Sequence, residues 1–245
     1  MPSVKNDFEI LDKFRFASPP VGVKFLAEPP RKAAKLNEKK SLCEMLKMAF
    51  EGSSFYADAQ NHTCEAGLYV LGQTDLEEPY LTGKFGAGMD IFRDERAAAR
   101  LYHYLPRLAR GEVNFVAFSP YDRLTFDPDV LIILADTGQA EILLRAMSYR
   151  TGGMWQSRYS SAVGCAWLFI HPYLSGEINF VATGLGLGMK RRKLFPEGMQ
   201  LVSIPFDRLS SMLETLREMP WIPRPLQPDG MEYVKRLRTK LGLDR

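Results

Sequence analysis

Three cysteines are the residues of this sequence with the most distinctive chemistry: Cys43, Cys64 and Cys165. Thiolates are soft ligands that favour zinc, copper(I) and iron–sulfur clusters. Four protein ligands are usual for zinc and for cubane clusters, so three cysteines leave one position for a substrate or another ligand. The three residues are far apart and form no C-x-x-C motif, so they can share a metal only if folding brings them together.

His62 stands two residues before Cys64 and is the candidate for the remaining metal ligand. A histidine with an ordinary pKa could also act as a general acid or base near neutral pH. The structural alternative is a histidine that caps a helix or only makes hydrogen bonds. The sequence leaves these three roles open.

The cysteines themselves have other interpretations. An odd number of widely spaced cysteines argues against a disulfide framework. A free cysteine often packs as a small apolar side chain. Alternatively, Cys64 at a helix start, with His62 nearby, could serve as an activated nucleophile, because a helix N-terminus lowers the pKa of a thiol.

A glycine-rich segment is the second candidate site. Gly184, Gly186 and Gly188 alternate with apolar residues and are followed by the basic residues Lys190, Arg191, Arg192 and Lys193. Glycines let successive N–H groups face an anion, so this segment predicts a cofactor-binding or anion-binding loop. It matches neither a Walker loop nor a dinucleotide fingerprint, and a basic surface turn is the structural alternative.

Composition excludes several classes of protein. The chain has 245 residues, of which 46% are hydrophobic and 25% charged, as in an ordinary globular protein. A net charge of +3 gives no electrostatic reason to expect nucleic-acid binding. No apolar run approaches the roughly 20 residues that span a bilayer, and the N-terminus lacks a secretory apolar segment. We expect a cytoplasmic protein without a membrane partner.

Elements that would position the candidate residues follow from local patterns. Ser41 and Glu44 have the spacing of a capping box for a helix over 41–52 that ends at Gly52, which places Cys43 in the first turn. A second helix is expected over 64–72, with Cys64 also in its first turn. Strands are expected over 21–26, 113–118, 130–135 and 202–206, and further helices over 94–110, 140–149, 207–219 and 231–240.

Short segments recur in the same order along the chain. Tyr121-Asp-Arg-Leu is matched by Phe206-Asp-Arg-Leu, and the interval from Gly52 to Cys64 equals that from Gly153 to Cys165. This order predicts an α/β fold (α+β remains an alternative) of two related halves, 18–125 and 126–219, around a pseudo-twofold axis. An N-terminal extension over 1–17 and a C-terminal tail with a short helix over 220–245 flank the two halves.

Longer segments resemble a known family, the bacterial and archaeal proteins with domain of unknown function 169. The resemblance lies in Pro20-Val-Gly-Val-Lys-Phe-Leu, Leu42-Cys-Glu-Met-Leu-Lys-Met-Ala-Phe-Glu-Gly, Asn61-His-Thr-Cys-Glu-Ala-Gly and Ala162-Val-Gly-Cys-Ala, and covers about residues 18 to 215. It implies cysteines at the positions of Cys43, Cys64 and Cys165 and assigns no activity. Many members also carry a cysteine near a segment that here reads Ala182-Thr-Gly-Leu-Gly-Leu-Gly, and its absence departs from the family pattern.

Three functional hypotheses follow. In the first, a 4Fe–4S cluster on the three cysteines serves redox chemistry or activates a small ligand between the halves. In the second, the protein binds a small organic molecule or haem without a cluster. In the third, it is a thiol-based enzyme that uses Cys64. Enzymatic activity stays open; the expected partner is a small-molecule ligand or an electron-transfer protein, and homo-oligomer formation is an open alternative.

Overall fold

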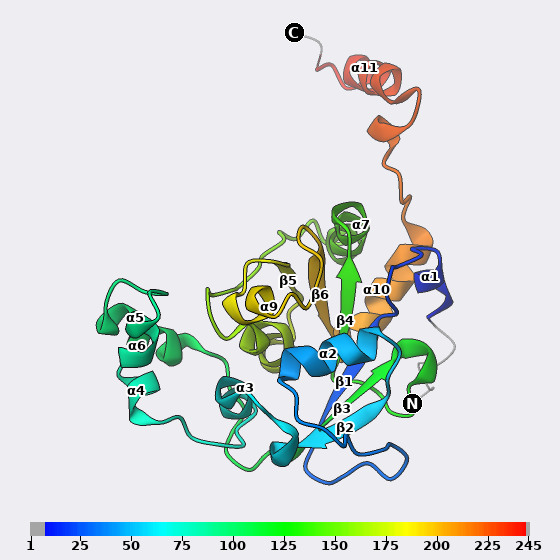
Figure 1. Cartoon of the computed structure of the whole chain (residues 1–245). Helices are drawn as coiled ribbons and strands as arrows, with labels where there is room; N and C mark the ends of the chain where they lie inside the picture. The colour runs from blue at the N-terminus through cyan, green and yellow to red at the C-terminus, as the bar shows by residue number, and fades with distance from the viewer. Residues whose placement is uncertain (1–7, 244–245) are drawn as a thin grey trace.

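The structure of the chain is a computed structural model that describes residues 8–243 (Figure 1). Within these residues, six strands form one sheet in the order β2-β3-β1-β4-β6-β5, and all neighbouring strands are antiparallel. The strands are β1 (Val21–Leu26), β2 (Phe55–Asp58), β3 (Phe115–Pro120), β4 (Val130–Ala135), β5 (Asn179–Ala182) and β6 (Gln200–Pro205). The protein therefore belongs to the mixed α and β class with an antiparallel sheet.

Helices cover both faces of this sheet. The α-helices are α1 (Glu9–Asp12), α2 (Leu42–Phe50), α3 (Glu65–Val70), α4 (Glu78–Leu81), α5 (Lys84–Gly88), α6 (Glu95–Tyr104), α7 (Thr137–Ser148), α8 (His171–Ser175), α9 (Leu187–Arg191), α10 (Phe206–Glu218) and α11 (Gly230–Lys240). Three 3-10 turns, η2 (Ala59–Asn61), η3 (Tyr121–Arg123) and η5 (Arg224–Leu226), and a π-helix, η4 (Ala166–Ile170), complete the elements. Within the described residues, no helix has the length and apolar composition needed to cross a bilayer.

The sheet separates two apolar layers. In β4, Val130, Ile132 and Leu134 face the layer formed with α2, α3 and the π-helix, whereas Leu131, Ile133 and Ala135 face the layer formed with α1, α7 and α10. This explains why β4 is a continuous apolar run, because both of its faces are covered. Figure 1 shows α11 standing apart from the sheet, beyond α10.

The order of the strands is symmetric about the middle of the sheet. From edge to centre, one side of the sheet has the order β2-β3-β1 and the other side has the order β5-β6-β4. The two sides meet where β1 pairs with β4. In the sequence, α2 precedes β2, and the π-helix followed by α8 precedes β5. Both α2 and the π-helix belong to the same apolar layer. Helix α7 lies on the opposite layer.

Several sequence predictions match this structure. The helix over 41–52 forms as α2, its Ser41–Glu44 capping box is present, and Gly52 follows it with φ of 99°. The strands at 21–26 and 130–135 are found with the expected bounds. The expected helix over 94–110 ends earlier, at Tyr104, because Leu105 precedes Pro106 and is extended, as residues before proline tend to be.

Other expectations need correction. Cys64 is the N-cap of α3 and so lies just before the first helical turn rather than inside it. The equal intervals that end at Cys64 and Cys165 do not place these residues at corresponding points, since Cys64 follows β2 whereas Cys165 precedes β5. Cys43 lies at the start of the helix that precedes β2, and Cys165 lies at the start of the π-helix that precedes α8 and β5.

Candidate functional site

Cys43 is the second residue of α2, and the local sequence fixes that position. The hydroxyl of Ser41 accepts a hydrogen bond from the N–H of Glu44, and the Glu44 carboxylate accepts one from the N–H of Ser41 at 2.8 Å. Met45, Leu46, Ala49 and Phe50 form the buried face of the helix, which packs on the sheet. Because the start of α2 and its buried face are both fixed, the direction in which the Cys43 side chain leaves the helix is fixed as well.

Cys64 is brought beside Cys43 by the segment that precedes α2. The backbone N–H of Lys40 donates to the carbonyl of Asn61 at 2.8 Å, and the N–H of Thr63 donates to the carbonyl of Lys40 at 3.1 Å. The side-chain amide of Asn61 also donates to the carbonyls of Leu36 and Glu38. These bonds join the residues before the two cysteines, so a separation of about twenty positions in sequence becomes a short one in space.

Cys165 comes from the second half of the sequence, at the N-cap of the π-helix Ala166–Ile170. All five residues of that helix are buried, and the side-chain amide of Asn179 on β5 donates to the carbonyl of Trp167 at 2.8 Å. Val163, two residues before Cys165, has φ of 56°. A β-branched residue rarely adopts this left-handed conformation, and strained backbone and π-helical turns both concentrate at functional sites.

The three cysteines line one small cavity of about 90 Å³, which we call the thiol cavity. It is lined by Ser41, Leu42, Cys43, Cys64, Ala66, Gly67, Tyr159, Val163, Gly164, Cys165, Gly186, Gly188, Met189 and Arg192. Segments from both sides of the sheet's centre therefore contribute to its wall. Three cysteines that are far apart in the sequence therefore line one space.

A tyrosine and two glycines shape the cavity wall. The hydroxyl of Tyr159 is buried and has no hydrogen-bond partner among the described residues. A Cβ atom at either Gly164 or Gly186 would collide with that hydroxyl, so glycine at both positions leaves it room. Buried hydroxyls normally have a partner, so the Tyr159 hydroxyl keeps the capacity to donate a hydrogen bond to a group in the cavity.

The environment keeps two of these thiols protonated. Burial raises the pKa of Cys43 to about 12, and the neighbouring Cys64 adds to the rise, while Arg192 opposes it. Burial, followed by Cys43 and Cys64, also raises the pKa of Cys165. The Tyr159 pKa is raised by burial and then by Cys43 and Cys165. Cys43 and Cys165 therefore lie close enough to Tyr159, and Cys64 close enough to both of these cysteines, to affect the pKa of the neighbouring group.

Within residues 8–243, no three His, Cys, Asp or Glu side chains are grouped so that they could hold a metal ion. His62 is absent from the lining of the thiol cavity and lies beside Gly67. Both of its ring nitrogens are buried without a hydrogen-bond partner among the described residues, and burial lowers its pKa to about 4. It is therefore a neutral imidazole at pH 7.

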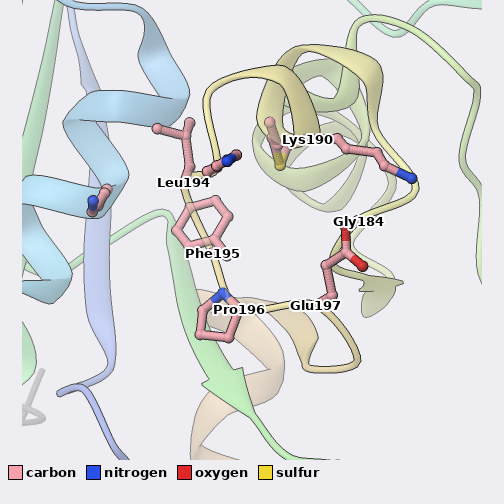
Figure 2. Close-up of a pocket in the computed structure, with 9 residues that line it drawn as sticks. Gly184, Lys190, Leu194, Phe195, Pro196 and Glu197 are labelled. Carbon is pink, nitrogen blue, oxygen red and sulfur yellow. The ribbon is translucent and has the colours of Figure 1, made fainter.

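The residues of the glycine-rich segment separate into three spaces. Gly186 lines the thiol cavity, Arg191 lines a larger chamber beside it, and Gly188 lines both. Gly184 and Lys190 line a hollow of about 590 Å³ on another side of α9. Figure 2 shows Leu194, Phe195 and Pro196 as one wall of this hollow, with Glu197 lying beside Gly184. The predicted loop thus does not form a single cradle, although α9 borders all three spaces.

Tyr159 and the larger chamber are not indicated by any local pattern that was interpreted as a site in the sequence. Tyr159 lies in an irregular segment between α7 and the π-helix, where no periodic pattern indicates which side chains face inward. The chamber, of about 630 Å³, is formed by α3, α4, α5 and α6 together with α9. The indication available in the sequence is the number of aromatic residues between Tyr80 and Tyr102, which core packing explains equally well.

Fold and site together define a mixed α and β protein in which an antiparallel sheet carries a thiol-lined cavity on one face. The chain belongs to the family of domain of unknown function 169, described as uncharacterised ArCR, which it matches over residues 9–215. It is 28% identical over 218 residues to the uncharacterised protein MJ0308 of Methanocaldococcus jannaschii, covering 86% of this chain and 92% of that protein. No solved structure matches the chain.

Proposed function

We propose that this protein holds an iron–sulfur cluster in the thiol cavity and uses it to transfer electrons or to activate a small ligand. The observation that carries the proposal is that Cys43, Cys64 and Cys165, from three separate segments, all line one cavity. The ligands of a cluster bind different iron atoms and need not meet around a single ion. A cluster held by three thiolates leaves one iron for another ligand, which supplies Lewis-acid or electron-transfer chemistry when the cluster is bound.

The residues around the thiols suit an anionic metal–thiolate group. Arg192 lies at the cavity with its Nε 3.8 Å from Oε2 of Glu44, and it stabilises negative charge near Cys43. The Tyr159 hydroxyl stays protonated and can donate a hydrogen bond to a thiolate or a sulfide. Because the thiols of Cys43 and Cys165 are neutral when no metal is bound, cluster binding must release protons.

A duplication of one ancestral unit would account for the symmetry of the site. The symmetric strand order and the corresponding positions of Cys43 and Cys165 before β2 and β5 support this origin. In addition, Cys64 is the N-cap of the first α-helix after β2, and Gly186 is the N-cap of the first α-helix after β5. Helix α7, on the other face, has no counterpart between β1 and β2 and would be an insertion.

A second candidate function is thiol chemistry at Cys64. It is favoured by a specific difference between the three cysteines, since Cys64 lines both the thiol cavity and the adjoining chamber, whereas Cys43 and Cys165 line the thiol cavity only. A ligand in the chamber would therefore meet the Cys64 sulfur first. In this alternative the buried thiols of Cys43 and Cys165 are structural.

Anaerobic purification followed by elemental analysis and an absorption spectrum distinguishes these functions. A cluster gives iron and acid-labile sulfide with broad visible absorbance, whereas haem gives a sharp Soret band. Protein that holds neither iron nor sulfide, even after anaerobic reconstitution, would instead support the thiol function, because fast alkylation of Cys64 is expected of the metal-free protein in both cases. Reconstitution with iron and sulfide under anaerobic conditions tests whether a metal-free preparation has merely lost its cluster.

A further inference from the structure

The larger chamber adjoins the thiol cavity directly. We define the chamber by its lining: Thr63, Cys64, Glu65, Ala66, Tyr80, Phe85, Gly86, Met89, Ile91, Phe92, Ala98, Leu101, Tyr102, Ala162, Val163, Leu187, Gly188, Arg191 and Arg192. Five of these residues, Cys64, Ala66, Val163, Gly188 and Arg192, also line the thiol cavity. A volume of about 630 Å³ is in the usual range for a pocket that binds a small organic molecule.

Aromatic side chains dominate one wall of the chamber. The rings of Tyr80 and Phe85 lie 4.5 Å apart, and those of Tyr80 and Tyr102 lie 6.4 Å apart and nearly perpendicular. Phe85 and Met89 remain 42% and 44% exposed, which leaves large apolar groups uncovered inside a hollow. A flat apolar molecule would bury these surfaces and stack against the rings.

The charged residues of the chamber are Glu65, Arg191 and Arg192, so positive charge exceeds negative. The Glu65 carboxylate already accepts a hydrogen bond from Tyr80, whose pKa burial and this bond raise to about 12. Arg192 has only the 3.8 Å approach to Glu44 as an ion pair, and Arg191 forms none with the described residues. Both guanidinium groups come from the end of α9, so the positive charge gathers at one side of the chamber.

We infer that the chamber binds a small aromatic carboxylate, with its carboxylate at Arg191 and Arg192 and its ring among the aromatic residues. Guanidinium groups match carboxylates in geometry and can bind them through two parallel hydrogen bonds. Such a ligand would lie beside Cys64 and the thiol cavity. The inference deepens the proposed function by naming its ligand class, but binding itself requires no cluster.

Titration of the full chain with 1-naphthoate and with its uncharged counterpart 1-naphthamide, by calorimetry, tests this assignment. We expect saturable binding of one naphthoate per chain and at least about tenfold weaker binding of the amide, since the amide cannot form charge-assisted hydrogen bonds with the guanidinium groups. The double variant Arg191→Ala/Arg192→Ala should lower naphthoate affinity about tenfold or more and leave the amide unchanged. Lys193→Ala, a change of the same type outside the chamber, is the matched control.

Phe85→Ala tests the apolar part of the chamber, because it removes a half-exposed ring without opening the core. This substitution should weaken the binding of naphthoate and of naphthamide to a similar extent. The assignment would be overturned if naphthoate and naphthamide bound with equal affinity. It would also be overturned if Lys193→Ala lowered the naphthoate affinity as much as the double arginine substitution does. So would the absence of saturable binding in protein that circular dichroism shows to be folded.

The same titration on the variant Cys43→Ser/Cys64→Ser/Cys165→Ser separates this inference from the proposed function. Naphthoate binding that persists in the variant, together with wild-type protein that never acquires iron, would refute the cluster and keep the chamber. A wild-type protein that binds iron and sulfide through its cysteines but no naphthoate would refute the chamber assignment alone.

Discussion

The hydroxyl of Tyr159 lies against Gly186, at the point where any larger side chain would place its Cβ atom. The two residues are joined by no hydrogen bond, and the Tyr159 hydroxyl has no partner among the described residues. This contact closes one side of the thiol cavity and links the irregular segment before the π-helix to the start of α9. It also gives a direct way to test the geometry of the site by substitution.

Gly186→Ala should destabilise the protein, because the added methyl group collides with Tyr159. Overpacking of this kind costs about 1–3 kcal/mol. Gly186 has φ of −81°, so the collision and not the backbone conformation is the cause. In the double variant Tyr159→Phe/Gly186→Ala the hydroxyl is gone and most of the loss should be recovered, as measured by denaturant unfolding.

Gly188→Ala is the matched control for this experiment. Its Cβ would approach only the end of the Arg192 side chain, at 3.5 Å, inside helix α9. It should be neutral or stabilising by up to about 1 kcal/mol, as expected for alanine in place of a helical glycine. Equal destabilisation by the two alanine substitutions, or no coupling between Tyr159 and Gly186, would contradict the described packing.

Tyr159→Phe alone should separate stability from cluster binding. Removing a buried hydroxyl that lacks a partner leaves the metal-free protein unchanged or more stable by about 1 kcal/mol. If the hydroxyl donates to the cluster, the same change should shorten the lifetime of the reconstituted cluster in air and shift its reduction potential. Tyr173→Phe, outside the cavity, serves as the control and should alter neither property.

Alkylation should distinguish the three thiols in the metal-free protein. A pKa of about 12 at Cys43, compared with the ordinary value of 9.0, means about a thousandfold less thiolate at neutral pH. The Cys165 thiol has its pKa raised in the same direction by burial. We expect iodoacetamide to label Cys64 first, as peptide mass spectrometry would detect, and bound iron to protect all three cysteines. Faster labelling of Cys43 than of Cys64 would contradict this order.

Acid stability should depend on Asp58, which orders the turn that leads to Cys64. Burial raises its pKa, but hydrogen bonds from Lys35 and from the N–H of Gln60 outweigh this and lower the pKa below the ordinary 3.8. A lowered pKa stabilises the folded state above that ordinary value, and the contribution is lost as pH falls through the folded-state pKa. The wild-type protein should therefore keep this contribution from neutral pH down to the ordinary 3.8 and lose it as pH falls below that value.

Two substitutions separate the roles of Asp58. Asp58→Asn keeps a capping side chain but loses the ion pair with Lys35, so its stability should fall less steeply in acid than that of the wild type. Asp58→Ala loses the cap as well and should be less stable at neutral pH by about 0.5–2 kcal/mol. Denaturant midpoints across this pH range provide the measurement, and identical pH profiles for the wild type and Asp58→Asn would refute the assignment.

Local signals explain which parts of the fold could be predicted from sequence. The capping box of Ser41 and Glu44 and the apolar run 130–135 act over a few residues, and both gave elements with the right positions. Strands β2 and β5 were missed because each has only four residues, too few to show an alternating pattern. Their pairing with β3 and β6 depends on the assembled sheet.

The candidate site shows the same limit. The cysteines could be identified by residue type, whereas their approach depends on backbone bonds between the residues around Lys40 and Asn61, which no local pattern reveals. The glycine-rich segment was expected to act as one loop, but the short helix α9 turns its residues toward different spaces. Tyr159 could not be found because its position is set by contacts with Gly164 and Gly186.

The most direct test of the proposed function is the amount of iron and acid-labile sulfide per chain after anaerobic reconstitution of the wild type and of Cys43→Ser/Cys64→Ser/Cys165→Ser. We expect about four iron and four sulfide per wild-type chain and close to none in the serine variant, with both proteins folded by circular dichroism. Equal iron and sulfide in the two proteins, or none in either, would contradict it.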